Sequence, residues 1–180
     1  MIRTRVGYCG GTSKDPTYHN IGDHSETIQI DFDPEKISYA QLLEIFWNTH
    51  NPCQRAYSRQ YMSAIFYHNE AQKKLAEETR AKKESASGKV HTQIAELKSF
   101  TLAEDYHQKY SLRYDSDLMK EFNAIYPDAK DFTNSTAAAR VNAWLAHPNT
   151  AAAKSDVDRL GLSPAGMQIL LKRIKVDPAR

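Results

Sequence analysis

The alternating pattern between Glu26 and Phe32 constrains the fold more than any other feature of this chain. Glu26, Ile28, Ile30 and Phe32 share one side of a period-two repeat, and polar residues alternate with them on the other side. Successive side chains of a strand point to opposite faces of a sheet, so the pattern predicts a strand with one face on the core. Glu26 therefore lies on the inward, apolar side of the predicted strand.

This placement makes Glu26 a candidate general acid. A carboxyl group turned inward loses hydration, which disfavours the charged form and raises the pKa. Such a group holds a proton near neutral pH and can deliver it to a substrate. The alternative is that Glu26 lies at the frayed start of the strand, where water or a capping interaction satisfies it.

Charge balance and cysteine content exclude several classes of function. Lys plus Arg total 24 and Asp plus Glu total 22, so no strong field favours nucleic acid or an anionic membrane. No apolar run approaches the roughly 18 residues of a membrane span, and the segment MIRTRVGYCGG lacks a signal-peptide core. The two cysteines cannot build a disulfide framework, and the seven histidines form no His-x-x-x-His pair. We therefore expect a cytoplasmic protein without metal, nucleic-acid or membrane partners.

Strand and helix patterns alternate through residues 1–113. Ser38 with Gln41 resembles a capping box, and Asn69 with Gln72 suggests a second N-cap. The Gly10-Gly11 pair permits a turn with positive φ. The patterns predict strands at 2–7, 26–32, 62–67 and 90–97, and helices at 39–50, 69–83 and 100–113.

Only helical patterns follow in residues 114–180. Leu118 and Phe122 belong to one apolar helical face, and the run STAAARVNAWLAH begins with a cap candidate. Ser163 before Pro164 suits an N-cap followed by the first helical position. We therefore predict an α+β fold, with a mixed domain at residues 1–113 and an all-helical extension at residues 114–180.

An ordered set of motifs adds a family resemblance to this reading. GYCGGT, PTY, the inward Glu of the next strand, FDPEKISYAQLLEIFWNTHNP, RQYMSAIFYH and AEDYHQKY follow one another along the chain. Together they resemble the A-type peptide methionine-S-sulfoxide reductase family, from about Thr4 to Arg113. The resemblance implies a mixed α/β sandwich related to the ferredoxin-like fold. It also implies protein repair under oxidative stress, no bound cofactor, and thioredoxin or another dithiol as external reductant.

The resemblance assigns roles to three residues. A cysteine thiolate attacks the sulfoxide sulfur once the oxygen is protonated, leaving methionine and a sulfenic acid on the enzyme. By resemblance Glu26 supplies the proton, and Tyr18 and Tyr61 hold the oxygen through their hydroxyls. Weaker candidates for the substrate pocket, each with packing as the alternative, are Tyr8, Tyr106 and His107.

The family's Gly-Cys-Phe-Trp-Gly motif does not occur in the 180 residues. In the family that motif begins the first helix, where a helix N-terminus favours the thiolate. We expect the first strand and helix, with a cysteine or selenocysteine nucleophile, to be encoded ahead of Met1. A start codon placed too late, a genuine shorter form and a recoded selenocysteine codon are the alternatives.

Cys9 and Cys53 are the thiols that the sequence does contain. Each is either an incidental thiol or a resolving thiol that forms a disulfide with the sulfenic acid. Cys53 is the favoured resolver because its segment, NPCQRAYSRQY, replaces a longer site-lining loop of relatives. No Asp or Glu lies between His50 and Tyr61 to support the site's hydrogen bonds as in that loop.

We expect the chain to be a thiol-dependent peptide-methionine (S)-S-oxide reductase whose turnover depends on the missing nucleophile. One alternative is a non-catalytic protein that binds sulfoxides or uses the helical extension to meet a partner. The other is a truncated isoform with no function of its own.

Overall fold

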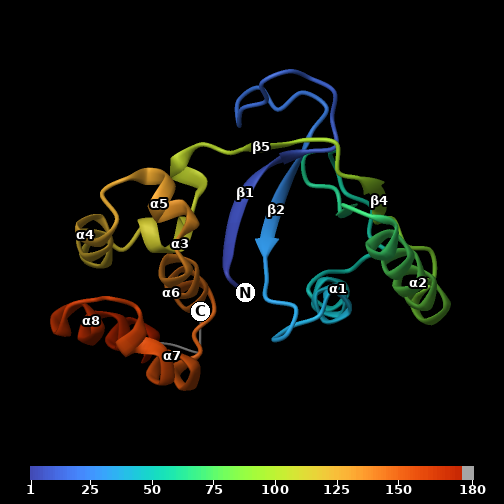
Figure 1. Cartoon of the computed structure of the whole chain (residues 1–180). Coiled ribbons are helices and arrows are strands. Elements are labelled where there is room, and N and C mark those ends of the chain that lie inside the picture. Colours follow the sequence, from blue (N-terminus) through green and yellow to red (C-terminus); the bar gives the residue numbers. More distant parts are fainter. Residues whose placement is uncertain (176–180) are drawn as a thin grey trace. The chain divides into compact units, whose positions relative to one another are not determined.

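The structure is a computed structural model that describes residues 1–175, and the chain divides into two compact units. The first unit holds Met1 and Val6–Ala103, and the second holds Ile2–Arg5 and the chain from Glu104 onward. The strands lie in the first unit, apart from the beginning of the first strand, and most helices lie in the second, so the prediction of an α+β fold is confirmed (Figure 1).

The first unit contains two small sheets. β2 (Ser25–Asp31), β1 (Arg3–Cys9) and β5 (Phe100–Leu102) form one sheet in the order β2-β1-β5, with β1 and β5 antiparallel. β3 (Ala64–Tyr67) and β4 (Gln93–Glu96) form a separate parallel pair. The predicted strands near 2–7, 26–32, 62–67 and 90–97 are confirmed.

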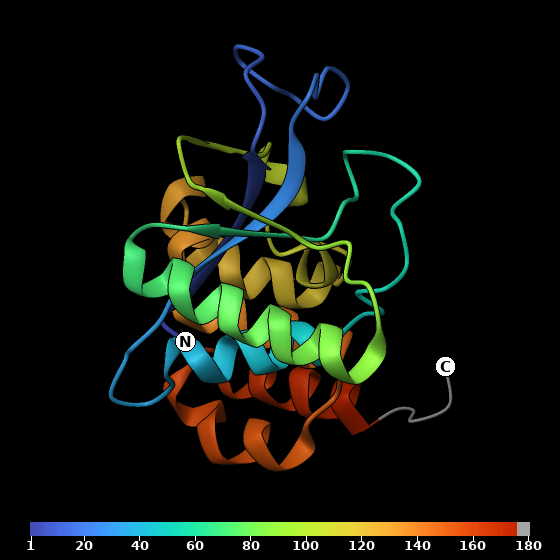
Figure 2. The same ribbon diagram turned by 90° about the vertical axis from the view of Figure 1, so that its right-hand side faces the viewer.

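Two helices pack against the β3–β4 pair. α1 (Tyr39–Asn48) begins with the predicted capping box of Ser38 and Gln41, and α2 (Glu70–Ser87) begins with Asn69 as N-cap. Figure 2 shows α2, in green, lying across these strands. The helices and the strand pair enclose the core of this unit, formed by Leu43, Trp47, Ile65, Ala76 and Val90.

The predicted helix at residues 100–113 is wrong. Residues 100–102 form β5, which pairs with β1 from Gly7 to Cys9, and a single 3-10 turn, η1 (Asp105–His107), follows. Lys109 then adopts φ 56°, a left-handed conformation that interrupts any helix, and α3 (Tyr110–Arg113) starts only after it. Pairing with a distant strand overrides the local helical spacing.

The second unit is helical, as the pattern after residue 113 predicts. Its longer helices are capped by Asp115, Ser135 and Ser163, whose side chains accept backbone N–H bonds in the first turn. After α3 it contains α4 (Ser116–Ile125), α5 (Ala129–Asn134), α6 (Thr136–Ala146), α7 (Thr150–Asp156), η2 (Val157–Arg159) and α8 (Pro164–Lys175). Its core includes Leu112, Leu118, Phe122, Val141, Leu170 and Ile174. Within the described residues no helix combines the length and apolar character needed to cross a membrane.

A buried lysine joins segments of the second unit that are far apart in sequence. Lys109 is 5% exposed, and its ammonium donates to the carbonyl oxygens of Thr4 and Thr133 at 2.5 Å and 2.9 Å. Burial, together with the charges of Arg5 and Arg113, lowers the pKa of Lys109 to about 8. Its charge is thus held in the interior by backbone dipoles rather than by a carboxylate.

This lysine makes the stability of the second unit depend on pH. Above pH 8 the folded chain loses the Lys109 proton, whereas the unfolded chain keeps it up to the ordinary value of 10.5. The unfolded state then binds more protons, so the free energy of unfolding rises with pH, by up to about 3 kcal/mol. Lys109→Met should abolish this rise, as measured by urea unfolding at pH 8, 9 and 10.

Fluorescence of Trp144 in a Trp47→Phe background reports the second unit, because Trp144 lies in α6. Lys172→Met, an exposed position of α8, is the control and should keep the rise. An unchanged pH dependence in Lys109→Met would contradict the prediction.

Candidate active site

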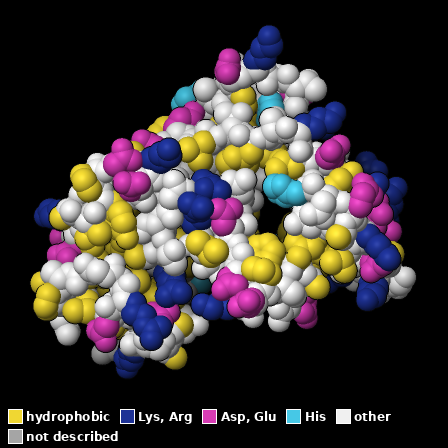
Figure 3. Space-filling model, viewed as in Figure 1, with side chains coloured by type: hydrophobic (Ala, Val, Ile, Leu, Met, Phe, Trp, Pro, Cys, Tyr) yellow, Lys and Arg dark blue, Asp and Glu magenta, His cyan; other side chains and the backbone are white. Residues whose placement is uncertain are grey.

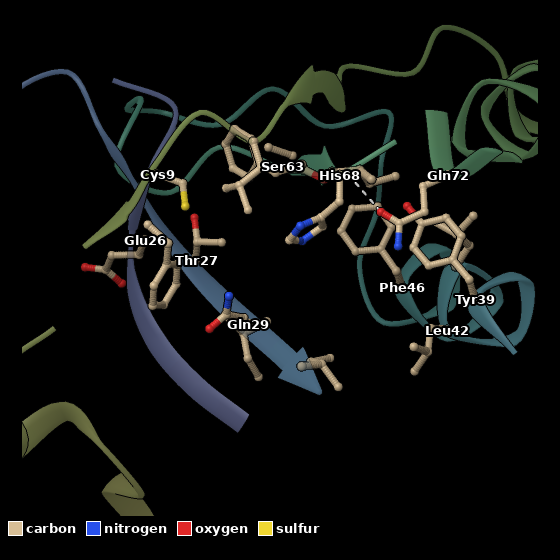
Figure 4. A pocket seen from close by; sticks show the side chains of 18 of the residues that line it. Cys9, Glu26, Thr27, Gln29, Tyr39, Leu42, Phe46, Ser63, His68 and Gln72 are labelled. Carbon is tan, nitrogen blue, oxygen red and sulfur yellow. Dashed lines mark hydrogen bonds between the residues drawn. The ribbon is translucent and has the colours of Figure 1, made fainter. Parts of the chain in front are cut away.

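A cleft of about 490 Å³ opens within the first unit. Its walls come from β2, from β3 and from α1, and Figure 3 shows the surface hollowed there with hydrophobic side chains on its rim. Figure 4 shows Thr27 and Gln29 of β2 facing Tyr39, Leu42 and Phe46 of α1 across the opening. The cleft is thus mostly apolar, with polar groups concentrated on the β2 side.

Glu26 lines this cleft at the start of β2, but the prediction that it is buried is wrong. Glu26 is exposed, and Ile28, two residues further on the same side, is 56% exposed. These two side chains lie on the opposite side of β2 from Thr27 and Gln29, which face α1 across the cleft (Figure 4). The period-two pattern correctly predicted a strand, but the side predicted to face inward is the more exposed one, since Thr27 and Gln29 are less exposed than Glu26 and Ile28.

Of the two predicted phenols, Tyr61 lies beside Glu26 and Tyr18 lies against Tyr61. Partial loss of hydration, the Glu26 carboxylate and the neighbouring Tyr18 raise the pKa of Tyr61, and Tyr18 and Tyr61 share a hydrogen bond. Both rings are partly exposed. Glu26 and Tyr61 thus line the cleft together, whereas Tyr18 lies against Tyr61 and is not among the lining residues.

Two further residues at this end escaped the sequence analysis. The Gln60 side chain donates to Glu26 Oε1 at 2.7 Å, and the Glu26 backbone N–H donates to the Gln60 carbonyl oxygen at 2.9 Å. Tyr57 lies against Tyr61, with ring centroids 5.3 Å apart. The motif RQY could have indicated Gln60. Its side-chain amide is next to Tyr61 in sequence and can donate the hydrogen bond to Glu26 for which no Asp or Glu is available nearby.

The loop that carries Tyr18 is fastened by Asp23. Its carboxylate accepts hydrogen bonds from the backbone N–H and hydroxyl groups of both Ser13 and Thr12, and these bonds hold the pKa of Asp23 well below its usual range. His24 is buried and bonds to the carbonyl oxygen of Ser13 and the N–H of Gly11. These hydrogen bonds therefore join the segment before Tyr18 to the segment after it.

The glycine turn that precedes this loop behaves as predicted. Gly10 has φ +82°, and a Cβ added there would lie 2.7 Å from the ring of Phe66. Arg59 adds a clamp by donating to the carbonyl oxygens of Gly10 and Asp23. The turn, the Tyr18 loop and the segment before Tyr61 are thus connected by hydrogen bonds.

The two thiols lie in different environments. Cys9 is fully buried at the wall of the cleft beside Thr27, and burial raises the pKa of Cys9 to about 11 (Figure 4). Cys53 is half-buried, and its S–H donates to the Ser87 carbonyl oxygen at the end of α2, at 3.3 Å. Cys9 lines the cleft, and Cys53 is not among its lining residues.

The weaker candidates are not among the residues that line the cleft. Tyr8 is 2% exposed in β1, and the tilted rings of Tyr106 and His107 contact each other in η1 of the second unit, with centroids 4.2 Å apart. Their part in substrate binding stays a prediction. Over the residues that the structure describes, no group of three His, Cys, Asp or Glu side chains could hold a metal ion.

Comparisons with known proteins agree on one family. The family model described as peptide methionine sulfoxide reductase matches residues 1–140. A peptide methionine sulfoxide reductase of Drosophila melanogaster is 38% identical over 172 residues, covering 93% of this chain and 69% of that protein. A peptide methionine sulfoxide reductase MsrA of Methanococcoides burtonii is 46% identical over 123 residues, covering 61% of this chain and 80% of that protein.

Solved structures are similar to a smaller part of the chain. Mxr1 from Saccharomyces cerevisiae in reduced form aligns with a TM-score of 0.58 and 26% identity, covering 62% of this chain and 70% of that chain. Methionine sulfoxide reductase A of Corynebacterium diphtheriae aligns with a TM-score of 0.53 and 27% identity, covering 62% of this chain and 63% of that chain.

Glu26 should control the ionisation of Tyr61. Glu26→Gln removes a negative charge that disfavours the phenolate, so the pKa of Tyr61 should fall. Gln60→Leu should lower the pKa of Tyr61 by less, because the Glu26 carboxylate keeps its charge and loses only the Gln60 amide that holds it in place. The measurement is a pH titration of the Tyr61 ring by carbon NMR.

Glu44→Gln on the outer side of α1 is the matched control and should leave the Tyr61 titration unchanged. A Tyr61 titration that is the same in Glu26→Gln and in the parent would show that the two side chains do not meet in solution.

Asp23 should protect its loop from proteolysis. Asp23→Asn weakens the hydrogen bonds to Ser13 and Thr12, so trypsin should cut after Lys14 several-fold faster. The same bonds depress the Asp23 pKa, so their contribution to stability should be present above the ordinary value of 3.8 and be lost as pH falls below it. Asp33 lies outside this loop, so trypsin should cleave the Asp33→Asn variant after Lys14 at the same rate as the parent protein.

Proposed function

This chain belongs to the peptide methionine sulfoxide reductase family, and on that premise we propose that its cleft serves the reduction of methionine-S-sulfoxide, free or in proteins. The observation that supports this most directly is that Glu26 and Tyr61 meet at one end of the cleft, with Tyr18 next to Tyr61. A carboxyl group and two phenols can surround a single sulfoxide oxygen with proton donors. The apolar wall from α1 can take the substrate's methyl and methylene groups.

Each of these three residues has its own role in the first step, the reduction of the sulfoxide. Tyr18 and Tyr61 donate hydrogen bonds to the sulfoxide oxygen, and Glu26 delivers a proton to it. A thiolate attacks the sulfoxide sulfur, and the protonated oxygen leaves that sulfur as hydroxide. The hydroxide then bonds to the sulfur of the attacking thiol as the transient sulfur–sulfur bond breaks, which gives a sulfenic acid and releases methionine. Gln60 holds the Glu26 carboxyl group in place through its amide.

The second step returns the thiol to its reduced state. A second thiol attacks the sulfenic sulfur, water leaves and a disulfide forms; a thioredoxin-like dithiol in the cytoplasm then reduces that disulfide. Cys53 is the resolving thiol in this proposal, because it is the less buried of the two cysteines. The cycle repairs an oxidised methionine with no bound cofactor.

Neither cysteine of the 180 residues suits the attacking role. The raised pKa of Cys9 keeps it protonated near neutral pH, and the Cys53 thiol is engaged with a backbone carbonyl. We therefore propose that the 180-residue chain alone binds the sulfoxide without reducing it. This observation also favours the second candidate function, a sulfoxide-binding protein without turnover.

Binding and turnover should be measured separately on the purified chain. N-acetylmethionine-S-sulfoxide methyl ester should shift NMR signals at the cleft and bind more tightly than the R epimer. Tyr61→Phe should weaken binding by roughly fivefold, the worth of one hydrogen bond. Tyr114→Phe, an exposed tyrosine of the second unit, is the control.

Turnover with dithiothreitol should stay at background. Robust reduction would contradict the assignment of the thiols, and Cys9→Ser and Cys53→Ser would then identify the attacking group. Equal binding of the two epimers, or binding of neither, would remove the support for the proposed function.

A further inference from the structure

Three polar residues at the ends of α1, β3 and β4 form a chain of hydrogen bonds at the wall of the cleft. His50 follows the C-cap of α1, Ser63 directly precedes β3, and Thr92 directly precedes β4. The Ser63 hydroxyl oxygen lies 2.8 Å from His50 Nε2 and 2.9 Å from the Thr92 hydroxyl oxygen. His50 and Ser63 line the cleft, whereas Thr92 is 2% exposed. The chain therefore runs from the cleft into the interior of the first unit.

The chemistry of the acceptors determines the direction of this chain. His50 Nδ1 lies 2.8 Å from the Phe46 carbonyl oxygen, and a carbonyl oxygen can only accept. Nδ1 therefore carries the proton, and Nε2 of the neutral ring accepts. The Ser63 hydroxyl donates to Nε2, and its oxygen accepts from the Thr92 hydroxyl. Removal of the Ser63 hydroxyl would therefore deprive both neighbouring groups of their partner in the chain.

Ser63 is one of two anchors of a very short segment. The other is Gln60, whose carbonyl oxygen accepts from the Glu26 N–H at 2.9 Å. Only Tyr61 and Met62 lie between the two anchors. Each anchor removes backbone conformations from this segment. The position of the Tyr61 ring therefore depends on the Ser63 end of the segment as well as on the Gln60 end.

His50 also contacts the apolar wall of the cleft. Its ring meets the Phe46 ring edge to face, with centroids 4.7 Å apart, and is stacked on the Trp47 ring at 6.4 Å. Phe46 lines the cleft, and Trp47 belongs to the core of the first unit. One side chain therefore contacts the apolar wall and, through Ser63, the segment that carries Tyr61.

We propose that His50 is a positioning residue that acts through Ser63 to hold Tyr61 in place at the cleft. His50 orients the Ser63 hydroxyl, and Ser63 fixes the end of the segment that presents Tyr61 to the sulfoxide oxygen. The two epimers of a sulfoxide differ in where the oxygen lies relative to the methyl group. A fixed distance between Tyr61 and the Phe46 wall therefore favours one epimer. The inference rests on the proposed function, since it names a further residue of that site.

The Tyr61 titration tests the positioning without any substrate. Partial loss of hydration and the Glu26 carboxylate raise the pKa of Tyr61 in the parent protein. Ser63→Ala should loosen the segment, so this pKa should fall toward its ordinary value of 10.0, as followed by carbon NMR. His50→Asn should act alike, because its amide reaches only as far as Nδ1 and keeps the bond to Phe46. His50→Gln reaches as far as Nε2 and should restore the parent titration.

Sulfoxide binding tests whether the effect passes through Tyr61. Ser63→Ala should weaken binding of N-acetylmethionine-S-sulfoxide methyl ester by no more than the roughly fivefold expected of Tyr61→Phe, because both act on one hydrogen bond. It should also reduce the preference for this epimer over the R epimer. In a Tyr61→Phe background, Ser63→Ala should have no further effect on affinity. A role in folding alone would leave the two effects independent and additive.

Thr79→Val is the matched control. The Thr79 hydroxyl accepts from Trp47 Nε1 at 3.0 Å, so this variant also breaks a hydrogen bond in the first unit, between α1 and α2. Urea unfolding should show that Thr79→Val and Ser63→Ala are both destabilised and both folded without urea. Thr79→Val should nevertheless keep the Tyr61 titration and the sulfoxide affinity of the parent protein.

Three outcomes would overturn the proposal. One is a Tyr61 titration like that of the parent in both Ser63→Ala and His50→Asn. Another is an additive loss of affinity in the variant that combines Ser63→Ala with Tyr61→Phe. The third is a His50 ring protonated on Nε2 alone at mildly alkaline pH, as seen by nitrogen NMR. If the parent protein binds no sulfoxide, the proposed function fails, and the Tyr61 titration still decides whether His50 holds Tyr61 in place.

Discussion

The candidate site depends on the main-chain hydrogen bond from Glu26 to Gln60. It fastens the beginning of β2 to the segment that leads into β3, although the two residues are 34 positions apart. The same pairing sets the Gln60 amide on the Glu26 carboxyl group and places Tyr61, the next residue, beside it. The Asp23 and Arg59 clamps then hold the Tyr18 loop to this junction. One backbone contact therefore positions an acid, its supporting amide and a phenol.

Local patterns in the sequence predicted the elements that local forces determine. The Ser38–Gln41 box, the Asn69 cap and the Ser163-Pro164 start appear as expected, because each is satisfied within one helical turn. The stretch at residues 100–113 could not be predicted in this way. Its first residues pair with β1, about 90 residues away in sequence, and the left-handed Lys109 is held by the carbonyl oxygens of Thr4 and Thr133.

The candidate site likewise has residues that the sequence could predict and properties that it could not. Strand parity and the family motifs predicted Glu26, Tyr18 and Tyr61 as site residues, since each lies in a short recognisable segment. They could not reveal that Glu26 is exposed, because parity reports the side of a strand and not whether anything covers it. Gln60 was missed for a related reason, as its role comes from a contact across the chain and not from its neighbours in sequence.

The exposure of Glu26 separates the position of this carboxyl group from its protonation. Glu26 and Ile28 point to the same side of β2, which is the more exposed side of the strand. A sulfoxide bound against Glu26 and Tyr61, as we propose, would remove water from the surroundings of the carboxyl group. Dehydration of a carboxyl group favours its protonated form, which is the form that a proton donor needs. Binding of the substrate and the acidic chemistry at this end of the cleft would therefore be coupled.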